Sequence, residues 1–156
     1  MNSFPVILFL DFDGVLHAVG GVAAKQRLAK LPLLEALLRE PELRQVGIVV
    51  SSTWRVAYTL AQLRSVFSPD MRARVQDCTP QLAQYAGAHA RHQEIAAWLA
   101  RHPEVRGWVA VDDDVAGFPP AAYPQTVFTA AESGLATADI ALLRQRLTDA
   151  ASPRPR

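Results

Sequence analysis

Short apolar runs recur along the chain and are separated by longer amphipathic stretches. Residues 6–10 form a continuous apolar run, and similar runs occupy residues 46–50 and 108–111. An apolar run without alternation is typical of a strand that is buried on both faces, as in a parallel sheet. Weaker runs at residues 126–128 and 74–76 predict an edge strand and a further short strand. We therefore expect about five strands.

The stretches between these runs carry apolar residues at helical spacing. Four such stripes occupy residues 31–38, 56–67, 95–102 and 140–147. Pro41, Pro69 and Pro103 follow the first three stripes, and a proline in this position is a common stop signal for a helix. Thr137 precedes the last stripe, which makes it the expected N-cap. These stripes are expected to be faces of helices that pack on the core.

Strands that alternate with helices predict one α/β domain. Such a pattern builds βαβ units, which produce a Rossmann-like central parallel sheet with helices on both faces. A chain of 156 residues fits one compact domain. We place this domain at residues 1–150. The proline- and arginine-containing end, residues 151–156, is expected to be a disordered tail.

The composition narrows the class of protein without identifying a partner. The formal net charge is +1, which is no strong electrostatic signature of nucleic-acid binding and does not exclude it. The single cysteine, Cys78, cannot form an internal disulfide and is expected to be structural, in a reducing compartment. The first apolar run is too short to span a membrane and lacks the layout of a signal peptide. We therefore expect a cytoplasmic protein without a membrane partner.

Polar side chains follow three of the apolar runs directly. Asp11 and Asp13 end the first run, Ser51 begins the segment after the second, and residues 112–114 are three consecutive aspartates after the third. Each group alone is also typical of a turn or a helix cap. The carboxyl ends of parallel strands, however, meet at one edge of a sheet, where ligands bind. Carboxylates that gather there repel one another unless a cation is bound, and a site of hard oxygen ligands suits Mg²⁺.

These segments together resemble the motifs of the haloacid-dehalogenase (HAD) superfamily. Asp11-Phe12-Asp13-Gly14-Val15-Leu16 is similar to the first motif, Ile48–Ser51 to the second, and Val109–Asp113 to the fourth. Arg91 fits the third motif, a cation near the start of the helix before the fourth. The order and spacing of these motifs cover residues 5–114. A closer resemblance is to the capless HAD domains associated with Swiss Army knife RNA-repair proteins, carried by residues 51–55, 91–99, 107–114 and 134–135.

The resemblance implies a phosphatase mechanism and assigns its residues. Asp11 would be the nucleophile that forms an aspartyl-phosphate, and Asp13 the general acid and base. Mg²⁺ would be held by the carboxylates of Asp11 and Asp112 and the backbone carbonyl of Asp13. Asp113 would be a direct or an outer-sphere ligand, and the sequence does not decide between them. Ser51 and Arg91 would bind the phosphoryl oxygens.

Several further residues near these motifs have alternative interpretations. Gly14 fits a turn close to the phosphate, where a side chain would obstruct approach. Arg55 is either a substrate contact at the rim of the site or an exposed helix arginine. Lys25 is an alternative to Arg91 as the phosphate-binding cation. Asp114 is expected to be a turn residue. His17, His89 and His92 are expected to have surface or packing roles.

The motif spacing leaves no room for a cap domain, and an open site favours a bulky substrate whose own body excludes water. A nucleic-acid end or a phosphoprotein would fit as the phosphorylated partner. Two alternatives remain: a phosphatase of small metabolites that is closed by oligomerisation, and a binding protein that keeps the fold without catalysis. The sequence leaves the oligomeric state open.

Overall fold

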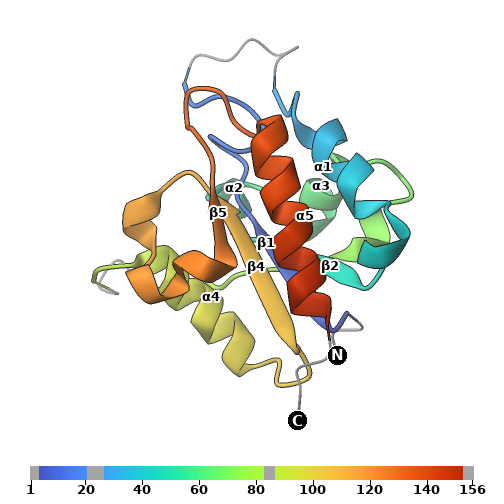
Figure 1. Ribbon diagram of the computed structural model, residues 1–156. Coiled ribbons are helices and arrows are strands. Elements are labelled where there is room, and N and C mark those ends of the chain that lie inside the picture. Colours follow the sequence, from blue (N-terminus) through green and yellow to red (C-terminus); the bar gives the residue numbers. More distant parts are fainter. Residues whose placement is uncertain (1–3, 21–26, 83–86, 153–156) are drawn as a thin grey trace.

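The central feature of the fold is one sheet of five parallel strands in the order β3-β2-β1-β4-β5 (Figure 1). The computed structural model describes residues 4–20, 27–82 and 87–152. The strands are β1 (Val6–Leu10), β2 (Val46–Val50), β3 (Val75–Cys78), β4 (Gly107–Asp112) and β5 (Thr126–Phe128). All five predicted strands are confirmed, and residues 126–128 do form an edge strand.

Alternate side chains of the central strand point to two separate cores. Leu8 lies in the core shared with α1 (Leu31–Leu38), α3 (Leu60–Ser65) and α5 (Thr137–Ala151). Phe9 lies in the opposite core with α4 (Ala90–Ala100). Both residues are fully buried. Helices therefore cover both faces of the sheet, which confirms the predicted Rossmann-like α/β architecture (Figure 1).

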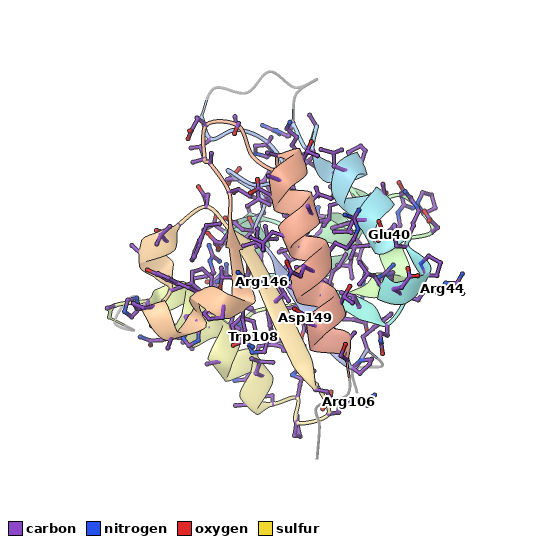
Figure 2. The ribbon with its side chains drawn as sticks, in the orientation of Figure 1. Glu40, Arg44, Arg106, Trp108, Arg146 and Asp149 are labelled. Carbon is purple, nitrogen blue, oxygen red and sulfur yellow. The ribbon has the colours of Figure 1, made fainter. Side chains whose placement is uncertain are left out.

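The last helix lies close against β4 because a glycine occupies the first position of that strand. A Cβ atom added to Gly107 would stand 2.5 Å from the backbone carbonyl oxygen of Ala150. Figure 2 labels the neighbouring side chains at this end of the sheet, with Arg106 and Trp108 at the start of β4 and Asp149 on α5. Any larger residue at position 107 would push α5 away from the sheet.

The stripe at residues 56–67 does not form one helix, contrary to the expectation. It is divided into α2 (Trp54–Ala57) and α3, with Tyr58 in an extended conformation between them. Thr59 caps α3 through a reciprocal pair of hydrogen bonds with Gln62. Val56 is 64% exposed and therefore does not belong to the core.

The helix ends were also predicted only in part. The N-cap of α5 is Ala136 rather than Thr137, and the backbone N–H of Ala136 donates to the carboxylate of Asp139 (2.8 Å). Helix α1 ends at Leu38, and Pro41 begins a short 3₁₀ turn (η2, Pro41–Leu43). The remaining 3₁₀ segments are η3 (Arg72–Arg74), η4 (Val115–Gly117) and η5 (Pro120–Gln125).

The described segments between the motifs contain no separately packed cap. Between β1 and β2 they form α1 and η2, and between β2 and α4 they form α2, α3, η3 and β3. Helix α5 ends at Ala151, and residues 153–156 of the expected tail lie outside the described residues. Among the described residues, none of the helices has the length and apolar character needed to cross a membrane.

Candidate active site

Three neighbouring strands end side by side and bring their following residues together. Leu10 of β1 pairs with Val50 of β2 and with Val111 of β4. The backbone N–H of Asp11 donates to the Val111 carbonyl (3.2 Å), and that of Ser51 donates to the Leu10 carbonyl (2.9 Å). The parallel register therefore places Asp11, Ser51 and Asp112 at one edge of the sheet, as the sequence predicted.

Three carboxylates form a compact acidic cluster at this edge. Asp11, Asp112 and Asp113 each offer an oxygen, and these oxygens lie within 4.8 Å of one another. Asp11 is 5% exposed and Asp112 1% exposed, so little solvent separates their charges. Such a group is unfavourable when all its members are ionised, because the charged forms are poorly solvated and repel one another.

Burial and mutual repulsion make the two innermost carboxylates hard to ionise. Burial, followed by the negative charge of Asp112, raises the pKa of Asp11 from 3.8 to about 8. Burial also raises the pKa of Asp112, to about 6. The guanidinium of Arg91 opposes both pKa shifts without cancelling them. The site therefore favours the binding of additional positive charge.

The oxygens that are left without partners fit a hard cation. One Asp11 oxygen accepts from the Phe12 N–H (2.8 Å), and Asp112 Oδ1 accepts from the Asp114 N–H (2.9 Å). Asp112 Oδ2 is buried and has no hydrogen-bond partner among the described residues. Arg91 Nε forms an ion pair with this oxygen, but one guanidinium does not offset the charge of three carboxylates, so the cluster indicates a place for a further cation.

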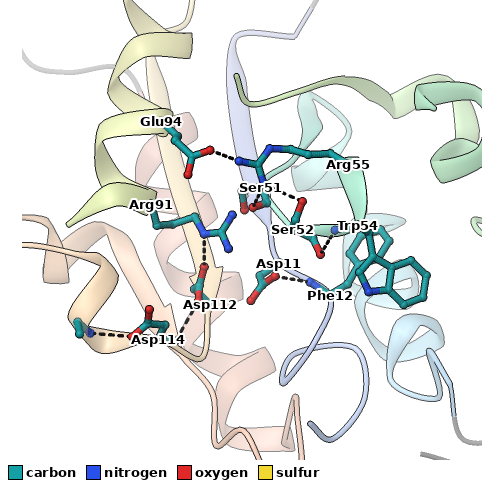
Figure 3. A network of polar contacts seen from close by, with 11 residues as sticks. Asp11, Phe12, Ser51, Ser52, Trp54, Arg55, Arg91, Glu94, Asp112 and Asp114 are labelled. Carbon is teal, nitrogen blue, oxygen red and sulfur yellow. Dashed lines mark hydrogen bonds and ion pairs between the residues drawn. The ribbon is translucent and has the colours of Figure 1, made fainter. Parts of the chain in front are cut away.

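Arg91 projects into the site from the first turn of α4. Its Nε lies 3.2 Å from Asp112 Oδ2. Its Nη1 is buried and has no hydrogen-bond partner among the described residues. Figure 3 shows the guanidinium pointing toward the same space as the carboxylates of Asp11 and Asp112. A free donor in this position suits an anionic oxygen of a ligand.

Arg55 is not an exposed helix arginine, contrary to one of the two expectations, and its role as a substrate contact stays a prediction. Its side chain is 6% exposed and forms an ion pair with Glu94 (Figure 3). It also donates to the backbone carbonyls of Ser51 (3.2 Å), Ser52 (2.8 Å) and Thr79 (3.1 Å). The physical reason is that these buried carbonyls need donors, so Arg55 holds the segment after β2 in place.

Gly14 lies in a turn, as predicted, and the structure gives a further reason for a glycine at this position. Gly14 has a φ of +76°, and an added Cβ would stand 2.3 Å from Asp113 Oδ2. The space that a side chain would fill is therefore taken by the Asp113 carboxylate. Closeness of this turn to the phosphate stays a prediction. Thr129 fixes this turn, because its hydroxyl donates to the Gly14 carbonyl (2.6 Å). Gly14 thus allows the loop after β1 to approach the acidic cluster.

Two side chains to which the sequence analysis gave no part in the chemistry, His17 and Trp54, contact the two carboxylate oxygens of Asp13. His17 Nε2 lies 2.8 Å from Oδ1, and the indole N–H of Trp54 donates to Oδ2 (3.1 Å). The backbone N–H of Leu28 donates to His17 Nδ1 (3.1 Å), so the ring hydrogen is on Nε2 and is donated to Asp13. His17 is 6% exposed. It therefore belongs to the site, whereas the sequence indicated a surface or packing role.

The other residues with open interpretations lie at the periphery. Asp114 is a turn residue, as predicted, and its carboxylate accepts from the Ala116 N–H (3.1 Å). His92 packs against Trp108 and Phe118, which confirms a packing role. Lys25, the alternative phosphate-binding cation, lies outside the described residues.

A comparison with models of protein families shows to which family the chain belongs. The model of a family described as "HAD domain in Swiss Army Knife RNA repair proteins" matches residues 7–140, a range that includes all the acidic residues of the site and the whole sheet except the first residue of β1. No match was found among curated proteins or among solved structures. The match extends over most of the chain and agrees with the capless α/β fold, so this chain belongs to the family of HAD domains found in Swiss Army Knife RNA-repair proteins.

Proposed function

We propose that the protein is a Mg²⁺-dependent phosphomonoesterase that forms a transient aspartyl-phosphate on Asp11. The observation that carries this proposal is the geometry of one sheet edge. There the buried Asp11 lies in one cluster with Asp112 and Asp113, and Arg91 forms an ion pair with Asp112 while its Nη1 has no hydrogen-bond partner among the described residues. This arrangement combines a nucleophile, ligands for a cation and a donor for an anion.

Asp11 and Asp13, the two carboxylates of the first motif, have different roles in the proposed reaction. An oxygen of Asp11 attacks the phosphorus, the bond from phosphorus to the leaving oxygen breaks, and Asp13 gives that oxygen a proton. In the second half, a water attacks the phosphorus and gives its proton back to Asp13. The bond between Asp11 and phosphorus then breaks, which releases inorganic phosphate, restores the carboxylate of Asp11 and leaves Asp13 protonated as at the start.

The acidic cluster supplies the residues that would hold the metal. Bound Mg²⁺ would offset the charge of the phosphoryl oxygens. The carboxylates of Asp11 and Asp112 and the carbonyl of Asp13 are the proposed ligands, with Asp113 as a direct or outer-sphere partner. Ser51, which follows β2, and Arg91, in the first turn of α4, would contact the phosphoryl group.

The substrate we favour is a bulky phosphoester, namely the phosphorylated end of a nucleic acid. The described residues around the site form no cap. A substrate with a large body can exclude water from such an open site itself. The description of the family as RNA-repair proteins supports the same substrate class.

The direct test is a substrate panel combined with detection of the covalent intermediate. Release of inorganic phosphate would be measured with Mg²⁺ for oligonucleotides phosphorylated at either end, phosphopeptides and small phosphorylated metabolites. Rapid acid quenching followed by peptide mass spectrometry should find the phosphate on Asp11. Turnover without any phosphorylated enzyme would contradict the mechanism, and turnover restricted to metabolites would contradict the substrate class.

Arg91→Ala is expected to lower kcat by about 10²-fold or more, because it removes the free donor that faces the phosphoryl oxygens. Arg91→Lys should recover part of this loss, since the charge remains but the two-pronged donor does not. Single-turnover phosphorylation of Asp11 measures the affected step. Arg64→Ala, on α3 and away from the acidic cluster, is the matched control. An Arg91→Ala enzyme as fast as this control would move the phosphate-binding role to another cation, with Lys25 the first to test.

Trp54→Phe is expected to lower kcat about tenfold on substrates with poor leaving groups, as part of the general-acid contribution of Asp13 is lost. The phenyl ring keeps the contact with Phe12, but the N–H that holds Asp13 is removed. The loss should shrink for 2,4-dinitrophenyl phosphate, whose leaving group needs no proton. Trp108→Phe is the control. An equal loss on both kinds of substrate would mean that Trp54 acts only on the fold.

A further inference from the structure

A cavity of about 420 Å³ opens beside Asp13, outside the acidic cluster. Its walls include Asp13, His17, Arg27, Thr53, Trp54 and Tyr58. The volume lies within the roughly 300–1,000 Å³ that small-molecule sites usually span. The residues of the acidic cluster do not line this cavity, so the phosphoryl chemistry described above does not account for it.

Asp13 determines which part of a substrate would enter this cavity. This step rests on the proposed function, in which Asp13 gives its proton to the leaving oxygen. The leaving oxygen must then lie within hydrogen-bonding distance of Asp13. The phosphoryl group itself is held on the other side, between Asp11 and Arg91. The body of the leaving group therefore extends from Asp13 into the cavity.

Two aromatic side chains, Trp54 and Tyr58, form part of the wall of the cavity near Asp13. The indole of Trp54 donates to Asp13 at one edge, and its ring lies 5.6 Å from the ring of Tyr58, between ring centroids. Tyr58 is 44% exposed, although large aromatic side chains are usually covered. The extended conformation of Tyr58, which breaks the expected helix between α2 and α3, is what places this ring beside Trp54.

A positive charge lies over the same surface. The guanidinium carbon of Arg27 stands 5.8 Å from the centre of the Trp54 ring. Among the described lining residues, Arg27 is the only arginine or lysine, and Asp13, the proposed acid, is the only carboxylate. Aromatic rings next to an arginine, beside a groove for phosphate, are the combination that binds single-stranded nucleic acid by stacking of bases and contact with the backbone.

We propose that the cavity lined by Trp54, Tyr58 and Arg27 is a leaving-group subsite that binds the terminal nucleoside of a phosphorylated nucleic-acid end. The base stacks on the aromatic pair, and Arg27 contacts the next phosphodiester.

A nucleoside suits this cavity better than a phosphotyrosine. The ring of a phosphotyrosine is attached directly to the ester oxygen and would stay at Asp13, whereas a base is separated from that oxygen by a ribose. The aromatic surface continues past Trp54 to Tyr58, which matches the longer reach.

The first test measures binding of a ligand without phosphate, so it does not depend on catalysis. Adenosine would be titrated into the wild-type protein without metal and followed by calorimetry. We expect saturable binding that Tyr58→Ala weakens by roughly tenfold or more, as expected for the loss of one stacking partner. Tyr58→Phe keeps the ring and should bind like the wild type. Tyr123→Ala removes a similarly exposed tyrosine on η5, away from this cavity, and is the matched control.

The second test measures selectivity during turnover. Two trinucleotides with a terminal phosphate would be compared, identical except that the phosphorylated nucleotide of one is abasic. Both the 5′- and the 3′-phosphorylated pairs would be assayed, and the end that is turned over faster would be used. The ratio of kcat/KM for the two trinucleotides should favour the one with the base by about tenfold or more. Tyr58→Ala should bring this ratio toward one, and Tyr58→Phe should keep it.

The outcomes separate the subsite from the proposed activity. Adenosine binding that depends on Tyr58, in a protein that hydrolyses no phosphoester, would support the subsite and overturn the phosphatase assignment. Hydrolysis with equal kcat/KM for the two trinucleotides would support the phosphatase and overturn the subsite. A phosphotyrosine peptide preferred over both trinucleotides, with the preference lost in Tyr58→Ala, would also overturn the nucleoside assignment.

Discussion

Asp11→Asn is expected to abolish turnover, with a loss on the order of 10⁴-fold or more, because an amide cannot replace a carboxylate as nucleophile. The same change should leave the protein at least as stable as the wild type at pH 8 without metal. Burial and the charge of Asp112 disfavour an ionised Asp11, and the neutral amide removes this penalty. The amide oxygen can still accept from the Phe12 N–H. Phosphate release and thermal unfolding of both proteins are the measurements.

The matched control is Asp114→Asn, which removes a neighbouring carboxylate whose partner is a backbone N–H in a turn. We expect this variant to keep turnover close to that of the wild type. If Asp11→Asn hydrolysed phosphoesters at a rate close to that of the wild type, Asp11 would not be the nucleophile. If it lost activity together with its cooperative unfolding transition, the loss would be one of folding, and the assignment would then depend on detecting the phosphorylated peptide.

The sheet was predictable from the sequence because its strands are buried on both faces. A strand without a solvent-facing side must be apolar at every position, so β1 and β2 appear as uninterrupted runs. The apolar pattern of β3 is weaker because this strand is less buried. Only Val75 is buried there, and the rest of this edge strand is partly exposed, so polar residues are tolerated.

The division between α2 and α3 was not predictable from periodicity. Val56, Leu60, Leu63 and Phe67 have helical spacing, but Val56 points to solvent. The signal that was present is Thr59 followed three residues later by Gln62, a capping box that marks the start of a new helix. The local capping pattern therefore outweighed the apolar stripe.

The acidic cluster was predictable because its members follow strands directly, and the parallel register fixes where strands end. The environment of Asp13 was not predictable, because its partners come from a turn and from the start of the short helix α2, and the positions of both depend on tertiary packing. His17 lies four residues after Asp13 in a turn, and Trp54 lies forty-one residues away. The burial of Arg55 was not predictable for a related reason. The carbonyls that it satisfies become buried only after the chain has folded.

Removal of Mg²⁺ is expected to abolish turnover, and its addition to stabilise the protein more at pH 8 than at pH 5. The pKa values of Asp11 and Asp112 are raised in the folded state, to about 8 and about 6, from 3.8. Without metal, the folded protein therefore holds more protons than the unfolded chain between about pH 4 and pH 8. The sign of the linkage is that stability falls as pH rises through this window. Mg²⁺ binds the ionised carboxylates and should restore that loss.

Thermal unfolding from pH 5 to pH 8, with and without saturating Mg²⁺ at matched ionic strength, measures this effect. At pH 8 we expect Mg²⁺ to raise Tm by about 5 °C or more, since a ligand at 100 times its Kd adds about 2.7 kcal/mol of stability. At pH 5 the shift should be much smaller, because protons compete for the same oxygens.

Asp11→Asn is the informative control for this effect. It removes the group with the higher pKa, so the decline in stability between pH 6 and pH 8 should disappear in the metal-free variant. A Tm shift by Mg²⁺ that is equal at both pH values, or full activity after treatment with a chelator, would place the metal away from these carboxylates. The metal would then have no part in the proposed reaction at this site.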